Sequence, residues 1–393
     1  MLMVNDRLEH GAVRDLRIDF FRGLALYMIL VDHVVADPIS KFTYQTFGFS
    51  DAAEMFVFLS GVSCGIVYSR VLERRGWTGI MAAISRRSIL IYGYCMLSSI
   101  VIILLLEAAS PSIKNAGVID QSFILLREDP YSSIWSAIFL ISPPDLPGIL
   151  VLYIVLTLIV IPLFLMGATR NAALTLAASG FIWTISQLYS DLAPRLADHS
   201  YFNPLAWQFL FSIGMFMGIR HDFDWSGLRS TLTFRWLLVA AWAIVIGSFL
   251  YRHSSFLLSR LQVDLDGFHL SSTTYVHMKE NLSAVRLLHF LSVALLVATY
   301  VSSSNPIFRF GAVIVRTGRC SLEVFCVSVI LSVVLSIIVV VYHPSVFEKL
   351  GLDGIAILLM ALTAFVFSKF RGERNRAIGM AKMDDLGRKD GQQ

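Results

Sequence analysis

Residues 18–36 read IDFFRGLALYMILVDHVVA, an apolar run long enough to cross a bilayer as a helix. Arg22, Asp32 and His33 lie within it, and eleven residues separate Arg22 from His33. At about 100° per residue these two return to nearly the same helix face, about 16 Å apart along the axis. An ionisable group inside a bilayer costs about 2.5–3.5 kcal/mol on insertion scales, so we expect these residues to have a function.

The composition of the chain is that of a membrane protein. Of its 393 residues, 56% are hydrophobic and 15% are charged, whereas soluble domains carry about 25% charged residues. The first apolar run lacks a small-residue cleavage site, so we expect it to remain as a span. Four cysteines lie in or beside apolar runs, which favours small buried residues over disulfides or a metal site: Cys64, Cys95, Cys320 and Cys326.

The apolar segments predict an all-α, polytopic membrane protein with about ten transmembrane helices, bounded by charged or Pro/Gly-rich breaks. An eleventh apolar stretch, 134–141, is too short to cross, and the prolines after it indicate a re-entrant or interfacial helix. The ten predicted spans are 18–36, 52–72, 88–107, 146–166, 171–189, 204–220, 234–251, 284–303, 320–342 and 351–370.

The placement of lysine and arginine orients these spans. With the N-terminus inside, the predicted inner segments hold 22 Lys and Arg residues and the outer loops hold 8. Cytoplasmic loops carry the excess of positive charge, so we predict that both termini are cytoplasmic. The chain then divides into a cytoplasmic segment 1–17, a membrane domain 18–370, and a basic cytoplasmic tail 371–393 that we expect to be disordered.

The Asp32-His33 pair is a candidate for proton chemistry. A neutral imidazole can take a proton from a hydroxyl, and a nearby carboxylate stabilises the imidazolium. Adjacent helix residues point about 100° apart, so Asp32 either supports His33 indirectly or faces another helix. The alternative is a structural polar cluster that ties the first span to its neighbours.

Residues 48–61, GFSDAAEMFVFLSG, open the second span. Either Ser50 or Asp51 can cap that helix, where a carboxylate meets the positive end of the dipole. Glu54 is deeper, and we expect it to share a cavity with His33 because both approach from the outer side. The small pair at 60–61 lets a helix, or a ligand chain, come close.

The densest basic patch lies on the predicted inner face: Arg70, Arg74, Arg75, Arg86 and Arg87. Topology and anionic lipid explain such a patch. The functional interpretation is a phosphate clamp for a nucleotide-bearing donor. No Walker motif or Gly-rich fingerprint is present, so a nucleotide would be held by other means.

Six residues at the outer ends of predicted spans are candidate contacts for an acceptor substrate. The amides suit hydrogen bonds to a polyol, and an arginine and a histidine one turn apart suit a ligand contact. Helix capping, an interfacial tryptophan and a snorkelling arginine are the structural alternatives. The six are Asp145, Asn203, Trp207, Gln208, Arg286 and His289. Three histidines of the second outer loop match no metal-ligand spacing: His253, His269 and His277.

Several of these stretches resemble a known family. Arg14 to Leu26, Asp32-His33, Phe49 to Gly61, and Asn203 to Gln208 resemble the OpgC-domain membrane proteins, which are named for succinyl transfer to osmoregulated periplasmic glucans. The spacing from arginine to histidine, together with Phe56-Val-Phe-Leu-Ser-Gly61, Arg86-Arg87 and Gly318 to Phe325, also resembles the broader acyltransferase-3 superfamily. The resemblance covers roughly residues 14–370.

The resemblance implies a bacterial inner-membrane O-acyltransferase. It would move succinyl or acetyl from a cytoplasmic acyl-CoA to a hydroxyl of a periplasmic glucan or another extracytoplasmic glycan. Arg22 and His33 occupy the catalytic-motif positions, joined in our assignment by Asp32 and Glu54. The chain departs from the superfamily after Phe325, where a histidine often ends the motif.

The resemblance also suggests the binding residues. The CoA phosphates would meet Arg86 and Arg87, and we add Arg75, Ser60 and Gly61 to the donor site. The expected partners are membrane lipid and the glycan acceptor, with no metal and no nucleic acid; a homo-oligomer is left open. A proton-coupled transporter or exporter that uses Asp32, His33 and Glu54 is the alternative function.

Overall fold

The computed structural model describes residues 15–113, 148–189, 202–220, 229, 231–253 and 278–390. Every regular element in these ranges is helical, which confirms the predicted all-α class. Five of the described helices are long and apolar enough to cross a membrane: Ala52–Ala109, Gly148–Leu188, Leu232–Arg252, Ser321–Tyr342 and Val346–Glu373. The predicted short helix at 134–141 lies outside the described residues.

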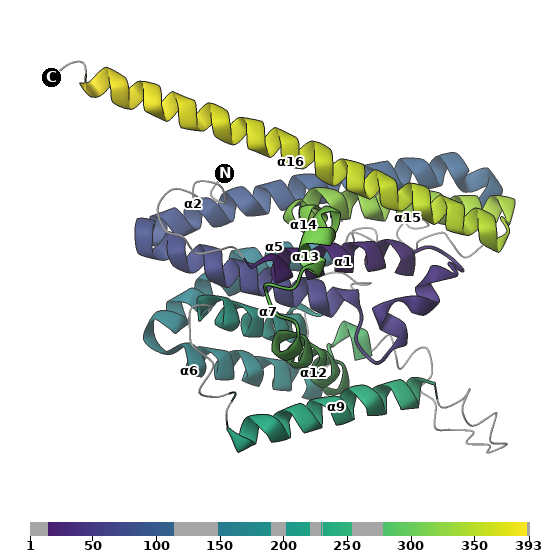
Figure 1. Cartoon of the computed structure of the whole chain (residues 1–393), viewed down its shortest axis with the longest axis horizontal. Helices are drawn as coiled ribbons and strands as arrows, with labels where there is room; N and C mark the ends of the chain where they lie inside the picture. Colours follow the sequence, from purple (N-terminus) through teal and green to yellow (C-terminus); the bar gives the residue numbers. More distant parts are fainter. Residues whose placement is uncertain are drawn as a thin grey trace.

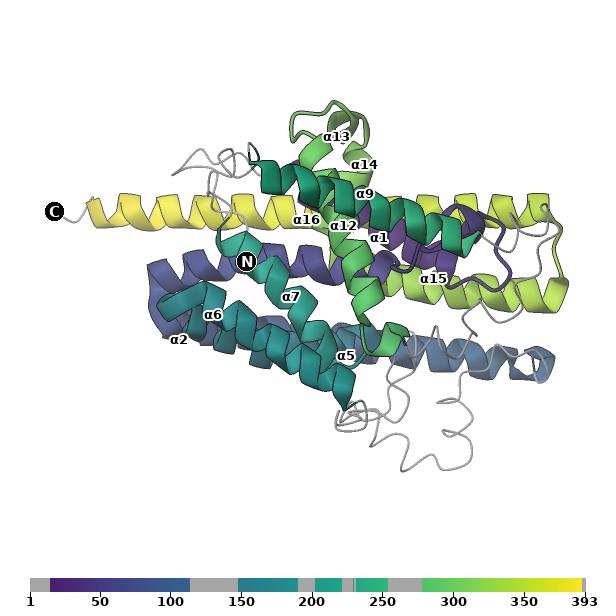
Figure 2. The ribbon, with the colours of Figure 1, turned by 90° about the horizontal axis from the view of Figure 1, so that it is seen from below.

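Long helices form most of the chain and pack as a bundle (Figures 1 and 2). The main helices are α1 (Leu16–Asp32), α2 (Ala52–Ile113), α5 (Gly148–Val155), α6 (Ile161–Leu188), α7 (Pro204–Ile219), α9 (Leu232–Arg252), α12 (Ala284–Tyr300), α15 (Ser321–Tyr342) and α16 (Val346–Asp390). The shorter elements are η2 (Ile39–Phe42), η3 (Tyr44–Thr46), the π-helical η4 (Leu156–Val160), α13 (Ile307–Phe310) and α14 (Ala312–Arg319).

Two of the long helices contain a break. At Gly76 (φ 63°) the chain leaves helical geometry, and the two arms of α2 run in opposite directions from this bend (Figure 1). Glycine suits the position because a positive φ costs it no Cβ clash. At Asn171 (φ −155°) α6 breaks, and the Asn171 side chain accepts from the Ala173 and Leu174 N–H groups, which restarts the helix. The sequence placed span boundaries near both points.

Helix α1 is shorter than predicted. It ends at Asp32 rather than at residue 36, so His33 is its C-cap and not a residue of the helix interior. Two features explain the early end. Pro38 disfavours helical geometry just before it. The Asp32 carboxylate accepts from the Thr43 hydroxyl at 2.6 Å and from the Gln45 amide at 2.8 Å, which holds the following loop back against the helix end.

Glycines bring α2 and α7 into backbone contact. A Cβ at Gly61 would lie 2.2 Å from the Phe211 carbonyl oxygen, and one at Gly214 would lie 2.3 Å from the Phe58 carbonyl oxygen. Gly65 and Gly218, four residues further along each helix, make the same kind of contact. Spacing small residues four apart is a common way for membrane helices to approach closely. The gap beside Gly61 is therefore filled by α7, which settles one alternative that the sequence left open.

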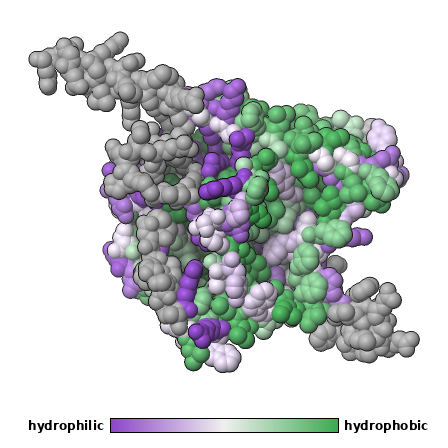
Figure 3. All heavy atoms as spheres, viewed as in Figure 1, coloured by the Kyte–Doolittle hydropathy of each residue, from purple (hydrophilic) through white to green (hydrophobic). Residues whose placement is uncertain are grey.

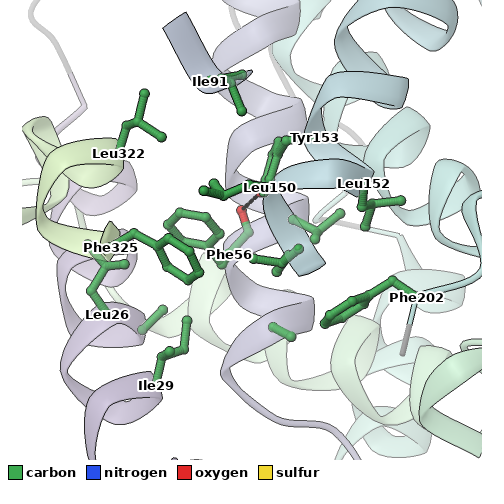
Figure 4. Packing of buried hydrophobic residues seen from close by; sticks show 14 of the residues in the cluster. Leu26, Ile29, Phe56, Ile91, Leu150, Leu152, Tyr153, Phe202, Leu322 and Phe325 are labelled. Carbon is green, nitrogen blue, oxygen red and sulfur yellow. Dashed lines mark hydrogen bonds between the residues drawn. The ribbon is translucent and has the colours of Figure 1, made fainter. Parts of the chain in front are cut away.

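The core around this contact is aromatic and aliphatic. Phe56 of α2 stacks on Phe325 of α15 with centroids 6.0 Å apart and meets Tyr153 of α5 edge-on at 5.6 Å (Figure 4). The Tyr153 hydroxyl donates to the Phe56 carbonyl oxygen at 3.0 Å, so its polar atom is satisfied inside the core. Leu26 and Ile29 of α1 complete the cluster.

The molecule has a large apolar surface. Green, hydrophobic residues cover much of the face in Figure 3. Helix α9 exposes Trp236, Val239 and Trp242, and only 17% of its most apolar 18-residue stretch is buried. Such a surface is typical of helices that face lipid.

The C-terminal helix is longer than predicted. Helix α16 remains helical to Asp390 and extends past the bundle (Figures 1 and 2), where the sequence predicted a disordered tail from residue 371.

Candidate active site at the ends of α1, α2 and α12

The first turn of α2 is closed by a capping box. Asp51 is the cap: its Oδ1 accepts from the Ala53 N–H at 2.8 Å. Glu54, three residues later, returns the contact, since its Oε2 accepts from the Asp51 N–H at 2.9 Å. This reciprocal pattern satisfies two backbone donors at the helix start. Ser50 is therefore not the cap, although the sequence allowed either residue.

The other carboxylate oxygens bind two cations from the segment around α12. Arg286 donates from Nε to Glu54 Oε1 at 2.6 Å and from Nη2 to Asp51 Oδ2 at 3.0 Å. Lys279 Nζ lies 2.9 Å from the same Asp51 oxygen. The side chains of Arg286 and Glu54 are fully buried. We call Asp51, Glu54, Lys279 and Arg286 the four-charge cluster; it balances two negative charges with two positive ones, as buried ions require.

Neighbouring charges determine the protonation states of Asp51 and Lys279. Burial raises the pKa of the Asp51 carboxyl, but Lys279 and Arg286 outweigh it and leave that pKa below its ordinary value. Burial likewise lowers the pKa of the Lys279 ammonium, and Asp51 outweighs it, so the pKa lies above the usual value. Both groups are therefore charged at neutral pH, and the cluster is a set of ion pairs.

A second chain of contacts lies beside the cluster. Ser50 Oγ is 2.6 Å from His289 Nδ1, and the Tyr44 hydroxyl is 2.6 Å from Ser50 Oγ. Tyr44 also stacks on the His289 ring, with centroids 5.9 Å apart. His289 is one turn beyond Arg286 on α12 and is 1% exposed; Ser50 is fully buried. Burial raises the pKa of the Tyr44 hydroxyl above its usual value, so it remains a proton donor at neutral pH. We call Tyr44, Ser50 and His289 the hydroxyl–imidazole chain.

His33 lies at the same end of the bundle and is exposed. Its Nδ1 is 2.7 Å from the Ile29 carbonyl oxygen. A carbonyl oxygen only accepts hydrogen bonds, so Nδ1 carries the proton and, in the neutral ring, Nε2 carries the lone pair. His33 and Asp32 are both within electrostatic range of Lys279 and Asp51. The structure thus brings His33 near the four-charge cluster, whereas Asp32 bonds to the loop and not to His33.

Glu54 makes no described contact with Asp32 or His33. Its two oxygens are occupied by the Asp51 N–H and by Arg286. Asp32 Oδ1 is occupied by Thr43 and Gln45. A contiguous relay through the three residues, which a proton-coupled transporter would use, is absent from the described contacts.

Arg22 connects α1 to the middle of α2. Its Nη2 donates to the Leu59 carbonyl oxygen at 2.8 Å and to the Ser63 hydroxyl. Arg22 and Arg87 both lie within electrostatic range of the Cys64 thiol, so the fold-back of α2 brings Arg87 level with Arg22. Arg75 and Arg86 are exposed, as is Arg87. Ser60 is half-buried.

Three of the residues predicted to contact an acceptor are engaged within the protein. Asn203 caps α7 through the Leu205 N–H at 3.0 Å and bonds to Asn281 at 2.9 Å. Trp207 is fully buried, and its Nε1 donates to the Lys279 and Glu280 carbonyl oxygens. Gln208 donates to the Ser179 carbonyl oxygen at 2.9 Å. The contacts of Asn203 and Trp207 hold the segment that carries Lys279, whereas Gln208 joins α7 to α6.

The remaining residues that the sequence analysis considered are Asp145 and the three loop histidines. Asp145, His269 and His277 lie outside the described residues. His253 is the C-cap of α9, where its Nδ1 is 3.0 Å from the Phe249 carbonyl oxygen. Within the described ranges no group of three or more His, Cys, Asp or Glu side chains is placed to hold a metal ion.

The sequence missed Lys279 and the chemistry of Ser50. Lys279 was counted only as an outer-loop charge, and nothing local marks its pairing with Asp51, 228 residues away. Ser50 was considered only as a cap. Its contact with His289 depends on the packing of α12 against the loop before α2, which no local pattern encodes.

Comparison with known proteins gives one match. A family model described as OpgC protein matches residues 14–372, which is most of the chain. No curated protein and no solved structure matches the chain.

Proposed function

Because this chain belongs to the OpgC protein family, we propose that it is a membrane-embedded O-acyltransferase. It takes succinyl or acetyl from a cytoplasmic acyl-CoA and places it on a hydroxyl of a periplasmic glucan or another extracytoplasmic glycan. In this proposal the chain crosses a bacterial inner membrane about ten times, with both termini inside. The five long apolar helices and the breaks at Gly76 and Asn171 support that topology.

The observation that carries the proposal is the state of His33. The bond from Nδ1 to the Ile29 carbonyl oxygen leaves the Nε2 lone pair of an exposed, neutral imidazole available at the end of α1. A base of this kind takes the proton of an acceptor hydroxyl as the hydroxyl attacks an acyl carbonyl. The backbone carbonyl selects the tautomer, as a carboxylate does in other histidine bases.

The donor would bind from the other end of the bundle. Arg75, Arg86 and Arg87 are exposed cations that suit the phosphates of CoA. Arg87 lies near Arg22 and Cys64, which is about 20 Å from Ser50 by the rise of α2. An extended pantetheine arm covers such a span. Arg22 then lies along its path, where the guanidinium can donate hydrogen bonds to the amide carbonyls of the pantetheine arm.

The acceptor would enter where α1 ends and α2 and α12 begin. The four-charge cluster and the buried amides of Asn203 and Gln208 form a rigid wall on that side, and we assign them to shaping the site rather than to contacting the glycan. The transporter alternative has no contact among the described residues that favours it.

The test is acyl transfer by the purified protein with succinyl-CoA or acetyl-CoA and a periplasmic glucan. His33→Asn keeps a polar C-cap but removes the base, and we expect a loss of about 10²- to 10⁴-fold in kcat. Lys349→Gln, which removes a half-buried charge near the same end, is the control and should retain activity. Wild-type rates in His33→Asn would overturn the role of His33.

A further inference from the structure

We infer that the acyl group passes through a covalent ester on Ser50, with His289 as the base that activates its hydroxyl. The inference rests on the proposed acyltransferase function and adds a step to it. Ser50 is a fully buried hydroxyl that neither caps α2 nor bonds to the four-charge cluster. Its side-chain oxygen instead contacts His289 Nδ1 and the Tyr44 hydroxyl, each at 2.6 Å.

The hydrogen positions follow from the backbone. The Ser50 N–H lies 3.3 Å from His289 Nδ1 and can only donate, so Nδ1 is the acceptor and carries the lone pair of the ring. The Ser50 hydroxyl therefore donates to Nδ1 at 2.6 Å. Its single proton is then used, so the Tyr44 hydroxyl donates to Ser50 Oγ. The direction of the chain is Tyr44 to Ser50 to His289, which is that of a nucleophile bound to its general base.

The base is held in place from several sides. A Cβ at Gly48 would lie 2.1 Å from His289 Nε2, so the bare backbone of Gly48 is what allows the ring to fit. Tyr44 stacks on one face of the ring, and Phe49 meets it edge-on with centroids 6.4 Å apart. Arg286, one turn earlier on α12, is locked by Asp51 and Glu54, which fixes the helix that carries His289. A nucleophile and its base also need a third group that holds the base in the correct orientation, and these contacts meet that need for His289.

The two half-reactions balance with the groups present. In the first, Ser50 Oγ attacks the thioester carbonyl, His289 Nδ1 takes the Oγ proton, and the C–S bond breaks with its electron pair on the CoA thiolate. In the second, the acceptor hydroxyl gives its proton to His33 Nε2 and its oxygen attacks the seryl ester. The Oγ–acyl bond breaks, and Ser50 Oγ takes back the proton from His289. His33 then gives its proton to water on the acceptor side, and the CoA thiolate takes one from water on the donor side. Tyr44 stabilises the leaving Oγ through its hydrogen bond.

The experiment traps the ester in the full-length protein. Purified protein is incubated with succinyl-CoA, and in parallel with acetyl-CoA, without glucan, then denatured and analysed by intact and peptide mass spectrometry. We expect the mass of one acyl group per chain, on the peptide that contains Ser50, and resistant to neutral hydroxylamine. Ser50→Ala should carry no label, and Ser50→Cys should carry a label that hydroxylamine removes, since a thioester is cleaved where an ester survives.

Control variants separate chemistry from folding. Ser332→Ala removes a hydroxyl that is 1% exposed and bonds only to the Val329 carbonyl of its own helix, so it should label like the wild type. His289→Asn keeps an acceptor near the Nδ1 position but cannot take a proton, and labelling should slow about 10²- to 10⁴-fold. Melting temperatures of all variants, measured in the same detergent, identify any variant that fails to fold.

The outcomes distinguish this inference from the function on which it rests. Transfer to glucan by wild type without any acyl–Ser50, or by Ser50→Ala at the wild-type rate, would overturn the covalent step and leave the acyltransferase intact. A label on Cys64 in place of Ser50 would also overturn it. No transfer and no label with either donor would overturn both.

Discussion

Replacing Arg286 with methionine tests whether the four-charge cluster holds the site together. Arg286 is fully buried and makes the 2.6 Å bond to Glu54 and the 3.0 Å bond to Asp51. Removing it leaves two buried carboxylates with only Lys279 as counter-charge. Deleting one partner of a buried ion pair costs about 3–5 kcal/mol, and we expect that loss in the free energy of unfolding.

A double-mutant cycle makes the assignment specific. Glu54→Gln alone should cost about 1.5–3 kcal/mol, because a charge-assisted hydrogen bond becomes a neutral one. In the double variant the uncompensated carboxylate of Glu54 is gone, so the cost should be about 1–3 kcal/mol smaller than the sum of the two single changes. The assay is reversible unfolding in mixed detergent micelles, with the exposed Arg309→Met as control. Additive single costs, or a stable Arg286→Met, would refute the reasoning.

Three further predictions concern packing, pH and the donor. Gly214→Ala should lower stability by about 1–3 kcal/mol because its Cβ would meet the Phe58 carbonyl oxygen, whereas Gly247→Ala, with nothing within 4 Å, should not; equal melting temperatures would contradict the glycine contact. The stability that Lys279→Met removes should be greatest where both partners of the ion pair with Asp51 are charged. At low pH it shrinks, because the lowered pKa of Asp51 gives stability that is lost as the carboxylate is protonated; at high pH, the raised pKa of Lys279 gives stability that is lost on deprotonation. A difference that is as large at both extremes of a thermal-shift pH series as at neutral pH would count against the pair. Arg87→Ala should raise the donor KM about 10- to 150-fold with a smaller change in kcat, since it removes one charge-assisted contact made before the transition state; an unchanged KM in initial-rate assays would exclude the phosphate contact.

The sequence predicted the helices better than their contacts. The lengths of the apolar runs and the charged or Pro/Gly-rich breaks located most helix limits, because these depend on neighbouring residues. The cap of α2 was local too, and Asp51 was one of the two residues that the sequence allowed, but Glu54 was expected to share a cavity with His33 and instead completes the capping box. Helix α1 was drawn four residues too long, because its end depends on Thr43 and Gln45 in the loop beyond it.

The site was only partly predictable. The sequence named Glu54, Arg286 and His289, but it did not pair Glu54 with Arg286. The separation of 232 residues between those two means that only the packing of α12 on α2 creates the ion pair. Buried polar groups look alike in sequence whether they bind substrate or hold helices, and Gln208 proved to join α6 and α7. Geometry separated these roles by showing which polar atoms already have partners.

The central claim is that the acyl group crosses the bilayer through this chain. It is tested most directly in sealed vesicles that hold the protein in one orientation, with acyl-CoA on one side and glucan only on the other. We expect acylated glucan on the far side and free CoA on the donor side; with His33→Asn we expect no acylated glucan and no more than one free CoA per chain. Acylated glucan that forms only when donor and acceptor share one side, or that forms equally with His33→Asn, would contradict it.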